Sequence, residues 1–376
     1  MSKIEELIKE LCPNGVKFEM INKVVDLYYG KGNTIPKDGG NYPVYGCYGI
    51  VGYTSTYNNE NTPIVGHIGS AGKVSWGRGQ HFVTYNGTIC KTRNKNILNS
   101  RYLYHILLNL KLENCVKGSQ PFLSISDFGT MKIPVPPLEV QEEIVRILDK
   151  FGELEAELEA ELEARKSQYE FWRGKLLNIG NFNQKYITLG DIGKVCMCKR
   201  IMKNETSDSG DVPFYKIGTF GKQADAYISY NIFNDYKKRF SYPKKGEILV
   251  SCSGTIGRTV VFDGEDAYFQ DSNIVWLSNN ESKVLNKFLY YFYQTLPWNV
   301  SDGGTIKRLY NNQFISAKVP LYSLEGQKRI VSILESFDKL VNDISEGLPA
   351  EIEARRKQYE YYRNKLLSFE ELVINE

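Results

Sequence analysis

The sequence predicts an α+β protein in which two globular blocks alternate with two long helices. Three observations lead to this prediction: the length, an internal repeat, and an uneven distribution of charge. The 376 residues suffice for about two domains, each large enough to bury a core. The composition, 42% hydrophobic and 24% charged, is typical of a globular protein and not of a disordered or fibrous one.

One helical segment occurs twice in the chain. Residues 161–177 read ELEARKSQYEFWRGKLL, and residues 351–367 read EIEARRKQYEYYRNKLL. Upstream, the pattern Gln-x-x-Ile-Val-x-Ile-Leu-x-x-Phe occupies residues 141–151 and again 327–337. The first pair of segments lies 190 residues apart and the second pair 186, a difference of about one helical turn. We therefore expect two copies of one long helix that differ by a turn in the middle.

Apolar residues in both copies recur at steps of three and four, which is typical of a helix with one apolar face. We assign to that face, in its role as spacer and subunit-docking element, Ile144, Leu148, Phe151, Leu158, Tyr169, Trp172, Ile330, Leu334, Phe337, Tyr359 and Tyr362. Each copy would be roughly 60 Å long if unbroken, and Gly347 and Pro349 should kink or interrupt the second. Such a helix must bury its apolar face, so we expect an antiparallel coiled coil of the two copies with pseudo-two-fold symmetry.

These patterns divide the chain into five segments. They are an N-terminal helical segment (1–15), a first block (16–138), a first long helix (139–180), a second block (181–320) and a second long helix (321–376). In the first block we expect strands at 42–48, 64–67, 73–76 and 81–85 and a helix near 100–110. In the second we expect strands at 247–251, 257–262 and 268–276 and a helix near 284–295.

Charge is segregated along the chain. Residues 16–138 hold 13 Lys and Arg against 6 Asp and Glu, a net charge of +7, and residues 184–320 hold 18 against 13, a net charge of +5. Residues 139–177 between them hold 6 against 11, a net charge of −5. Two separate basic blocks favour two contacts with a polyanion such as nucleic acid.

No pattern of catalytic residues stands out, so the sequence predicts a binding protein and not an enzyme. Gly66–Lys73 differs in spacing from a phosphate-binding loop and is interpreted as a turn between strands. The pair Cys196 and Cys198 and the three histidines lack the spacing of a zinc site. The scattered, odd number of cysteines favours a reduced, cytoplasmic protein, and no apolar run is long enough to cross a membrane.

Several motifs together resemble the specificity subunit of type I restriction-modification systems. They are Leu-Cys-Pro-Asn-Gly-Val-Lys at 11–17, Pro-Val-Pro-Pro-Leu-Glu-Val-Gln at 134–141, and the two repeats ending in Lys-Leu-Leu at 175–177 and 365–367. The resemblance covers nearly the whole chain. It implies two α/β target recognition domains separated by two conserved helices, which is the arrangement that the repeat predicts.

The resemblance also implies a function. Each recognition domain would read one half of a bipartite sequence in double-stranded DNA. The helices would set the spacer between the halves and dock two methyltransferase subunits, which methylate adenine N6 with S-adenosylmethionine. Restriction subunits would add cleavage that depends on ATP and Mg²⁺. This chain would hold no cofactor or metal itself and would be a non-catalytic subunit.

Candidate DNA contacts are basic, amide and hydroxyl side chains on glycine-rich loops, since these groups bind base edges or phosphates. In the first block they are Lys31, Asn33, Lys37, Ser70, Lys73, Arg78 and Arg93. In the second they are Lys199, Arg200, Lys203, Lys216, Lys222, Arg258, Lys307 and Arg308. A solubilising surface charge is the competing interpretation of each. Four aromatic residues, Tyr45, Tyr48, Trp76 and Tyr215, are expected in the core.

Two alternatives remain open from the sequence. One is a coiled-coil scaffold that joins two protein-binding domains and binds no nucleic acid. The other is an enzyme, such as a fused methyltransferase or nuclease, which the missing motifs disfavour. The basic charge of both blocks favours the DNA-reading subunit over the scaffold.

Overall fold

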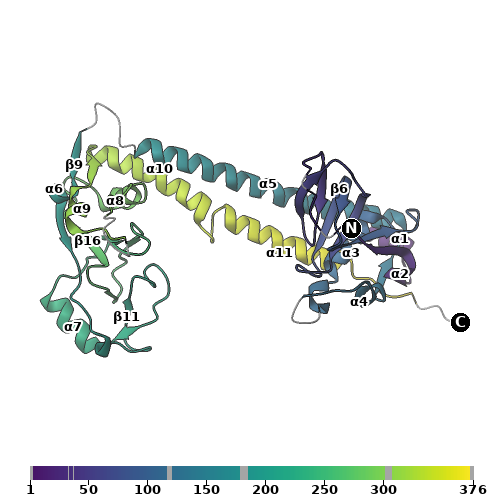
Figure 1. The fold of residues 1–376 in the computed structure, drawn as a ribbon, viewed down its shortest axis with the longest axis horizontal. Coiled ribbons are helices and arrows are strands. Elements are labelled where there is room, and N and C mark those ends of the chain that lie inside the picture. The colour runs from purple at the N-terminus through teal and green to yellow at the C-terminus, as the bar shows by residue number, and fades with distance from the viewer. Residues whose placement is uncertain are drawn as a thin grey trace. The chain divides into compact units, whose positions relative to one another are not determined.

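The computed structural model describes residues 3–32, 34–36, 38–116, 121–177, 185–300 and 307–372. The chain divides into two compact units, one of residues 1–160 and 351–376 and the other of residues 161–350 (Figure 1). The helix α5 (Leu138–Leu176) contributes its first part to the first unit and its last part to the second. The first unit is therefore assembled from both ends of the chain.

The first unit is built on a six-stranded sheet with the strand order β2-β7-β5-β6-β3-β4. Its strands are β2 (Val25–Tyr29), β3 (Tyr42–Tyr45), β4 (Ile50–Thr54), β5 (Asn59–Gly66), β6 (Val74–Val83) and β7 (Gly87–Thr92). All neighbours are antiparallel except β3 and β6, which are parallel. A separate antiparallel pair joins β1 (Lys17–Met20) to β8 (Lys132–Val135) and so closes the block where the chain enters and leaves it.

Short helices complete the first block. They are α2 (Ile21–Val24), α3 (Ser100–Asn109), the 3₁₀ turn η1 (Leu112–Cys115) and α4 (Ile125–Gly129). The Asn99 side chain caps α3 by accepting hydrogen bonds from the backbone N–H groups of Arg101 and Tyr102. The helix packs on β5, β6 and β7 through side chains such as Leu103 and Leu107, which are fully buried.

In the first unit, α5 pairs with α11 (Leu348–Leu366) in an antiparallel manner. The Phe151 ring stacks on Tyr362 with centroids 5.4 Å apart, and Arg356 forms ion pairs with Glu155 and Glu159. After α11, the chain runs parallel to the start of the block, where the backbone N–H of Val16 donates to the carbonyl of Glu370 at 2.9 Å. The N-terminal helix α1 (Lys3–Leu11) adds Ile4 to the same core.

The second unit contains two sheets in place of one. A four-stranded sheet has the order β10-β16-β13-β14, and a three-stranded sheet has the order β12-β11-β15. The strands are β10 (Gly193–Cys196), β11 (Val212–Tyr215), β12 (Tyr227–Ile228), β13 (Ile248–Ser251), β14 (Thr259–Val261), β15 (Tyr268–Phe269) and β16 (Ile274–Asn279). The pair β9 (Tyr186–Thr188) and β17 (Lys318–Pro320) closes this block as β1 and β8 close the first.

The helices of the second block are α6 (Leu189–Ile192), η2 (Lys203–Glu205), α7 (Tyr230–Arg239), α8 (Asn286–Tyr293) and α9 (Asn311–Ser316). One core surrounds α8 and β13, and a second lies around α7, where Phe233, Tyr268 and Trp276 are buried. The last part of α5 pairs antiparallel with α10 (Leu324–Asn342), and Tyr169 stacks on Phe337 with centroids 6.1 Å apart.

The second long helix is interrupted, as Gly347 and Pro349 predict. The α10 helix ends at Asn342 and α11 begins at Leu348. The backbone N–H of Gly347 donates to the carbonyl of Asp343, and a Cβ on Gly347 would lie 2.5 Å from the carbonyl oxygen of Lys339. Only glycine fits this turn, since any side chain would collide with the last turn of α10.

Each unit contains a buried glutamine whose side-chain amide makes the same three hydrogen bonds. Gln141 Nε2 donates to the carbonyls of Ile97 and Pro136, and its Oε1 accepts from the backbone N–H of Asn99 at 2.8 Å. Gln327 Nε2 donates to the carbonyls of Lys283 and Tyr322, and its Oε1 accepts from the N–H of Leu285 at 2.8 Å. All four residues of one set lie 186 positions from their equivalents in the other. Each amide thus fixes the first turn of a long helix against the start of α3 or α8.

Most of the expected elements are confirmed, but some differ in extent and the structure adds others. The predicted strands 73–76 and 81–85 form one strand, β6, and the predicted strand 268–276 is split by a turn into β15 and β16. The strands β4 and β7 and the helix α7 were not expected. A strand–helix–strand run occurs at residues 17–29 and again at residues 186–196.

No helix in the described residues is long and apolar enough to cross a membrane. All seven cysteines are free thiols.

The two glutamine amides give a first test of how each long helix is fixed to its block. We call this support, made of the strand pair, the one-turn helix and the glutamine of each unit, the frame. Replacing Gln141 or Gln327 by Ala leaves one N–H and two carbonyl groups without their partner in a buried place, so each change should lower the free energy of unfolding by about 2–4 kcal/mol. Chemical denaturation measures the loss. Matched changes of the exposed Gln168 and Gln358 to Ala should cost less than about 0.5 kcal/mol. Equal effects at buried and exposed positions would contradict the supporting role.

A buried carboxylate ties α1 to α5. Glu143 accepts hydrogen bonds from Arg146 and from Lys3, and these partners lower its pKa to about 2. Its contribution to stability is complete above the unfolded pKa near 4.5 and is lost as the pH falls toward 2. Glu143→Gln should therefore destabilise the protein by about 1–2 kcal/mol at pH 7, and the difference from the parent should shrink below about pH 4.5. A difference that does not depend on pH in urea titrations would refute this.

Candidate nucleic-acid interface

Four loops of the first block meet at one place. Backbones pass so close that a Cβ on Gly30 would lie 2.2 Å from the Thr84 carbonyl oxygen, and one on Gly66 would lie 2.1 Å from that of Cys47. The hydrogen bonds Lys31 N–H to Val83 O and His67 N–H to Asn86 O tie the loops together. We call residues 30–32, 46–48, 66–73 and 84–87 the first-block loop cluster. It is a set of turns joined by backbone hydrogen bonds.

The first-block loop cluster brings together three of the candidate DNA contacts, Lys31, Ser70 and Lys73. Lys31 and Lys73 are exposed, and the Lys73 ammonium lies 4.9 Å from the centre of the Tyr48 ring. The turn at 66–73 joins the antiparallel strands β5 and β6, so its interpretation as a strand turn and not a phosphate loop is confirmed.

The other candidates of the first block lie apart from this cluster. Arg78 is exposed on β6 beside a bulge in β5, toward the end of the strand pair away from Lys73. The Arg93 guanidinium donates to Asp26 at 2.8 Å and to the carbonyl of Lys23, which engages it within the chain. Asn33 and Lys37 lie outside the described residues.

Aromatic side chains add to the same surface. Tyr48 is 52% exposed, so its assignment to the core is wrong: it lies in the turn between β3 and β4, with the Lys73 ammonium over its ring. Tyr85 and Phe122 are each 40% exposed and pack around the buried His67 ring. Burial lowers the pKa of His67, so the ring is neutral near pH 7. Flat rings beside ammonium groups suit contact with nucleic acid.

In the second block, three candidate cations line one hollow of about 500 Å³, which also contains Gln270, Asp271 and Asn273. Arg200 donates to Asp271 at 2.8 Å, and Lys216 pairs with Asp225 at 2.8 Å. The third cation, Lys203, is exposed at the start of η2. The structure therefore gathers Arg200, Lys203 and Lys216, while Lys199 lies against the Phe240 ring at 5.3 Å.

Two arginines of the second block hold loops in place. Arg258 donates to the carbonyl of Phe220 at 2.8 Å, and its own N–H binds Ser251 Oγ. Arg308 donates to the carbonyl and hydroxyl of Ser272 and lines a second hollow beside the first, with Lys307 exposed next to it. Both arginines are half-buried, so each acts on loop geometry as well as on charge.

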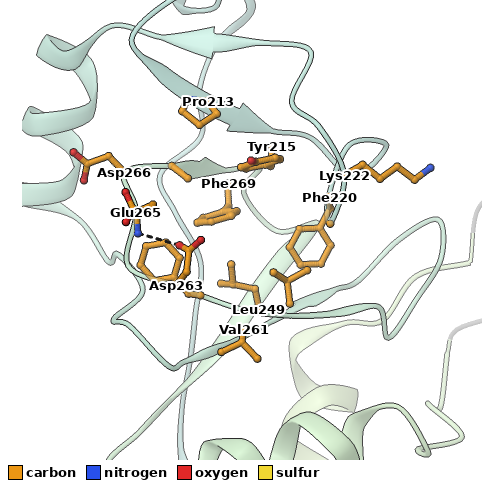
Figure 2. A pocket seen from close by; sticks show the side chains of 14 residues that line it. Pro213, Tyr215, Phe220, Lys222, Leu249, Val261, Asp263, Glu265, Asp266 and Phe269 are labelled. Atoms are coloured by element: carbon orange, nitrogen blue, oxygen red, sulfur yellow. Dashed lines mark hydrogen bonds between the residues drawn. The ribbon is translucent and has the colours of Figure 1, made fainter. Parts of the chain in front are cut away.

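The second block has a different cavity, with a volume of about 160 Å³. Figure 2 shows the side chains that line it. Its walls are apolar and aromatic, with Tyr215 stacked on Phe269 at 5.8 Å, and its rim carries three carboxylates. Carboxylates repel phosphate groups, so this cavity does not suit a nucleic-acid backbone. The candidate Lys222 belongs to its lining but extends away from the carboxylates (Figure 2).

Sequence reasoning missed the turn between β15 and β16, whose residues read Gln-Asp-Ser-Asn. Gln270 Oε1 accepts from the N–H of Ile217 at 2.8 Å, and Asn273 Oδ1 accepts from Ser253 Oγ at 2.9 Å. Both amides are thereby oriented in the hollow that Arg200 lines. An amide-rich run between two apolar segments is the signal that could have identified them.

The apolar positions of the long helices are used inside the chain. Ile144, Leu148, Ile330 and Leu334 are buried in the cores of their own units. Phe151, Leu158, Trp172, Phe337, Tyr359 and Tyr362 are half-buried, and Tyr169 is buried. These side chains hold the helices in place within their units, and the half-buried ones keep part of their surface exposed.

The described residues contain no group of three or more His, Cys, Asp or Glu side chains that could hold a metal ion. The buried His105 ring contacts Asp149 Oδ1 at 2.8 Å and the Tyr359 hydroxyl at 3.3 Å, and so joins α3 to α5 and α11. These contacts hold the three helices together.

The chain matches a family profile described as "Type I restriction modification DNA specificity domain" over residues 13–164 and again over residues 183–354. A putative type I restriction enzyme specificity subunit of Haemophilus influenzae is 50% identical over 344 residues, which cover 88% of this chain and 89% of that protein. A type I restriction enzyme specificity subunit of Escherichia coli is 33% identical over 297 residues, or 73% of this chain and 72% of that protein.

Solved structures share the fold at low sequence identity. The type I restriction-modification S subunit of M. genitalium has a TM-score of 0.58 at 18% identity, covering 94% of this chain and 96% of that one. The HsdS subunit of Thermoanaerobacter tengcongensis has a TM-score of 0.51 at 14% identity, covering 95% of this chain and 96% of that one. The two profile matches fall on the two copies of the repeated frame, and the chain belongs to the family of type I restriction-modification DNA specificity subunits.

Proposed function

We propose that each block of this chain reads one half of a bipartite sequence in double-stranded DNA. The long helices set the number of base pairs between the halves and dock two methyltransferase subunits. Those partners supply adenine-N6 methylation from S-adenosylmethionine, and restriction subunits supply cleavage with ATP and Mg²⁺. The chain is a non-catalytic, cytoplasmic subunit that provides the DNA sequence specificity of the complex.

One observation carries this proposal: the two units share a frame but not a surface. Both frames use a strand pair, a one-turn helix and a buried glutamine amide at equivalent places. The blocks on them differ, with six strands in one sheet in the first and two smaller sheets in the second. Two unlike surfaces on one kind of support are what two unlike half-sites require.

The charge of the blocks favours DNA over a protein scaffold. A scaffold needs the paired helices but gives no reason for exposed cations on both blocks, such as Lys73 in the first and Lys203 in the second. Cations on rigid turns that neutralise phosphates give a duplex its affinity, and neighbouring amides such as Gln270 add contacts to bases.

The native genome provides the direct test. Deleting the gene should abolish one bipartite methylated-adenine motif, and returning the gene should restore it, as single-molecule methylome sequencing would report. An unchanged methylome after deletion would overturn the proposal. A gel shift on mixed genomic duplexes with the methyltransferase present separates this function from a scaffold, which would give no shift.

The helix length gives a prediction about the spacer. Residues 154–164 repeat the unit Leu-Glu-Ala-Glu within α5, and one unit adds about 6 Å of helix, close to two base pairs. Deleting Ala156–Glu159 should shorten the spacer by one or two base pairs and leave both half-sites unchanged. Methylome sequencing of the deletion strain measures this. Loss of all methylation would instead favour a coiled coil needed only for assembly.

Salt dependence tests the candidate cations. Lys73→Ala and Lys203→Ala each remove one exposed ammonium group, so each should weaken cognate-duplex binding by the assembled complex and lower the slope of log K against log salt by about 1. Lys357→Ala, an equal change of charge on α11, serves as the matched control and should leave the slope unchanged. A slope that stays at the parent value in either block variant would remove that residue from the interface.

A further inference from the structure

The apolar cavity of the second block has room for one small ring (Figure 2). Its volume is about 160 Å³. A protein cavity of about 150 Å³ suffices to hold a benzene molecule. Aromatic rings form much of its wall, namely those of Tyr215, Phe220, Phe262 and Phe269. The three phenylalanine rings are buried in the core around α7, so packing holds this wall in place.

Carboxylates gather on the loop between β14 and β15, at the rim of this cavity. Asp263, Glu265 and Asp266 belong to the lining and are exposed. Asp266 pairs with Lys237 at 2.9 Å, but Asp263 and Glu265 form no ion pair within the described part of the chain. Asp263 accepts a hydrogen bond from the backbone N–H of Glu265 at 2.9 Å, which helps to fix its position. Two carboxylates without a cation therefore lie beside an apolar space of the size of a ring.

The nearby lysines leave this rim acidic. Lys222 belongs to the lining but extends away from the carboxylates (Figure 2). Lys245 lies beside Gly264, where a Cβ would be 3.3 Å from its aliphatic carbons, but Lys245 is not part of the lining. The charge of the rim thus favours a cation over an anion or a neutral molecule.

This cavity and the hollow that gathers Arg200, Lys203 and Lys216 lie on opposite faces of β11 and β15. Neighbouring side chains of a strand point to opposite faces of a sheet. Tyr215 and Phe269 line the cavity, whereas their neighbours in the chain, Phe214 and Gln270, line the hollow. The backbone N–H of Gln270 donates to the carbonyl of Tyr215 at 2.9 Å and ties the two segments together. An occupant of the cavity would therefore contact the strands that carry the hollow without covering the hollow.

We propose that this cavity binds a small organic ammonium ion whose apolar body is about the size of a benzene ring. The apolar body lies against Tyr215 and Phe269, and the ammonium group lies at the rim beside Asp263 and Glu265. A nucleotide would bring its phosphates to these carboxylates, and an inorganic cation would leave the apolar walls without a partner. The site is separate from the candidate DNA contacts and goes beyond the proposed function.

Titration of the full chain with benzylamine, followed by ligand-observed NMR, tests this site. Benzylamine combines a benzene ring with an ammonium group and should bind with a Kd of roughly 1 mM or below. Benzyl alcohol keeps the ring but lacks the charge, so it should bind at least about fivefold more weakly. Benzoate reverses the charge and methylamine lacks the ring, so neither should bind. The inference is wrong if benzylamine does not bind, or if benzyl alcohol and benzoate bind as tightly.

Variants of the chain locate the bound amine. Asp263→Asn and Glu265→Gln each remove one exposed charge and should weaken benzylamine binding by about two- to fivefold, and the double variant by about tenfold. The matched control is Asp208→Asn, which removes an exposed carboxylate from the lining of the hollow on the opposite face and should leave the Kd unchanged. Val260→Phe places a larger side chain in the wall of the cavity and should abolish binding.

Melting curves accompany each titration. The carboxylate variants change exposed side chains and should melt like the parent, so they test the site even where Val260→Phe does not fold. An unchanged Kd in both carboxylate variants, or an equal loss in Asp208→Asn, would overturn the inference. No step of this experiment involves DNA or a methyltransferase, so its outcome is independent of the proposed function.

Discussion

The structure depends on one buried primary amide in each unit. A glutamine in the first turn of a long helix satisfies two carbonyl groups and one N–H group that would otherwise be buried without partners. Because the same atoms meet at Gln327, the direction in which a helix leaves its block is the same in both units. A charged pair, Arg101 with Asp149 or Lys287 with Glu335, adds a second tie at equivalent positions.

This frame separates two tasks that a DNA-reading subunit must perform. The tied segments fix the helices, and the loops of each block remain free to differ in length and composition. The first block uses turns so close together that glycine is required, as at Gly66, and gathers lysines and aromatic rings there. The second block uses arginines and amides around the turn at 270–273. The two blocks thus present different loop surfaces on the same kind of frame.

The helices and their repeat could be predicted from the sequence because their signals are local. Steps of three and four, and Gly347 with Pro349, act within one or two turns. The sheets were predicted less well, because tertiary contacts decide them. Gly77 and Gly79 suggest a gap between two strands, yet β6 is continuous, and Gly77 is small because a Cβ there would lie 2.3 Å from the His81 ring.

The candidate site was predictable in kind but not in arrangement. Cations on glycine-rich turns mark both blocks, but no local pattern shows that Arg200, Lys203 and Lys216 share one hollow with Gln270. Nor does any local pattern show that Arg93 donates a hydrogen bond to Asp26, or that Arg258 donates one to the carbonyl of Phe220. These facts depend on pairings across 38 to 71 residues, which only the fold determines.

The parallel contact between Val16 and the segment after α11 has a consequence for the order of assembly on the ribosome. The second unit is contiguous and is complete once residue 350 has emerged, whereas the first waits for the last segment to be translated. Until then the nascent chain displays the Phe151 ring and the neighbouring turns of α5 without their cover. The earliest part of the polypeptide is thus the last to finish folding.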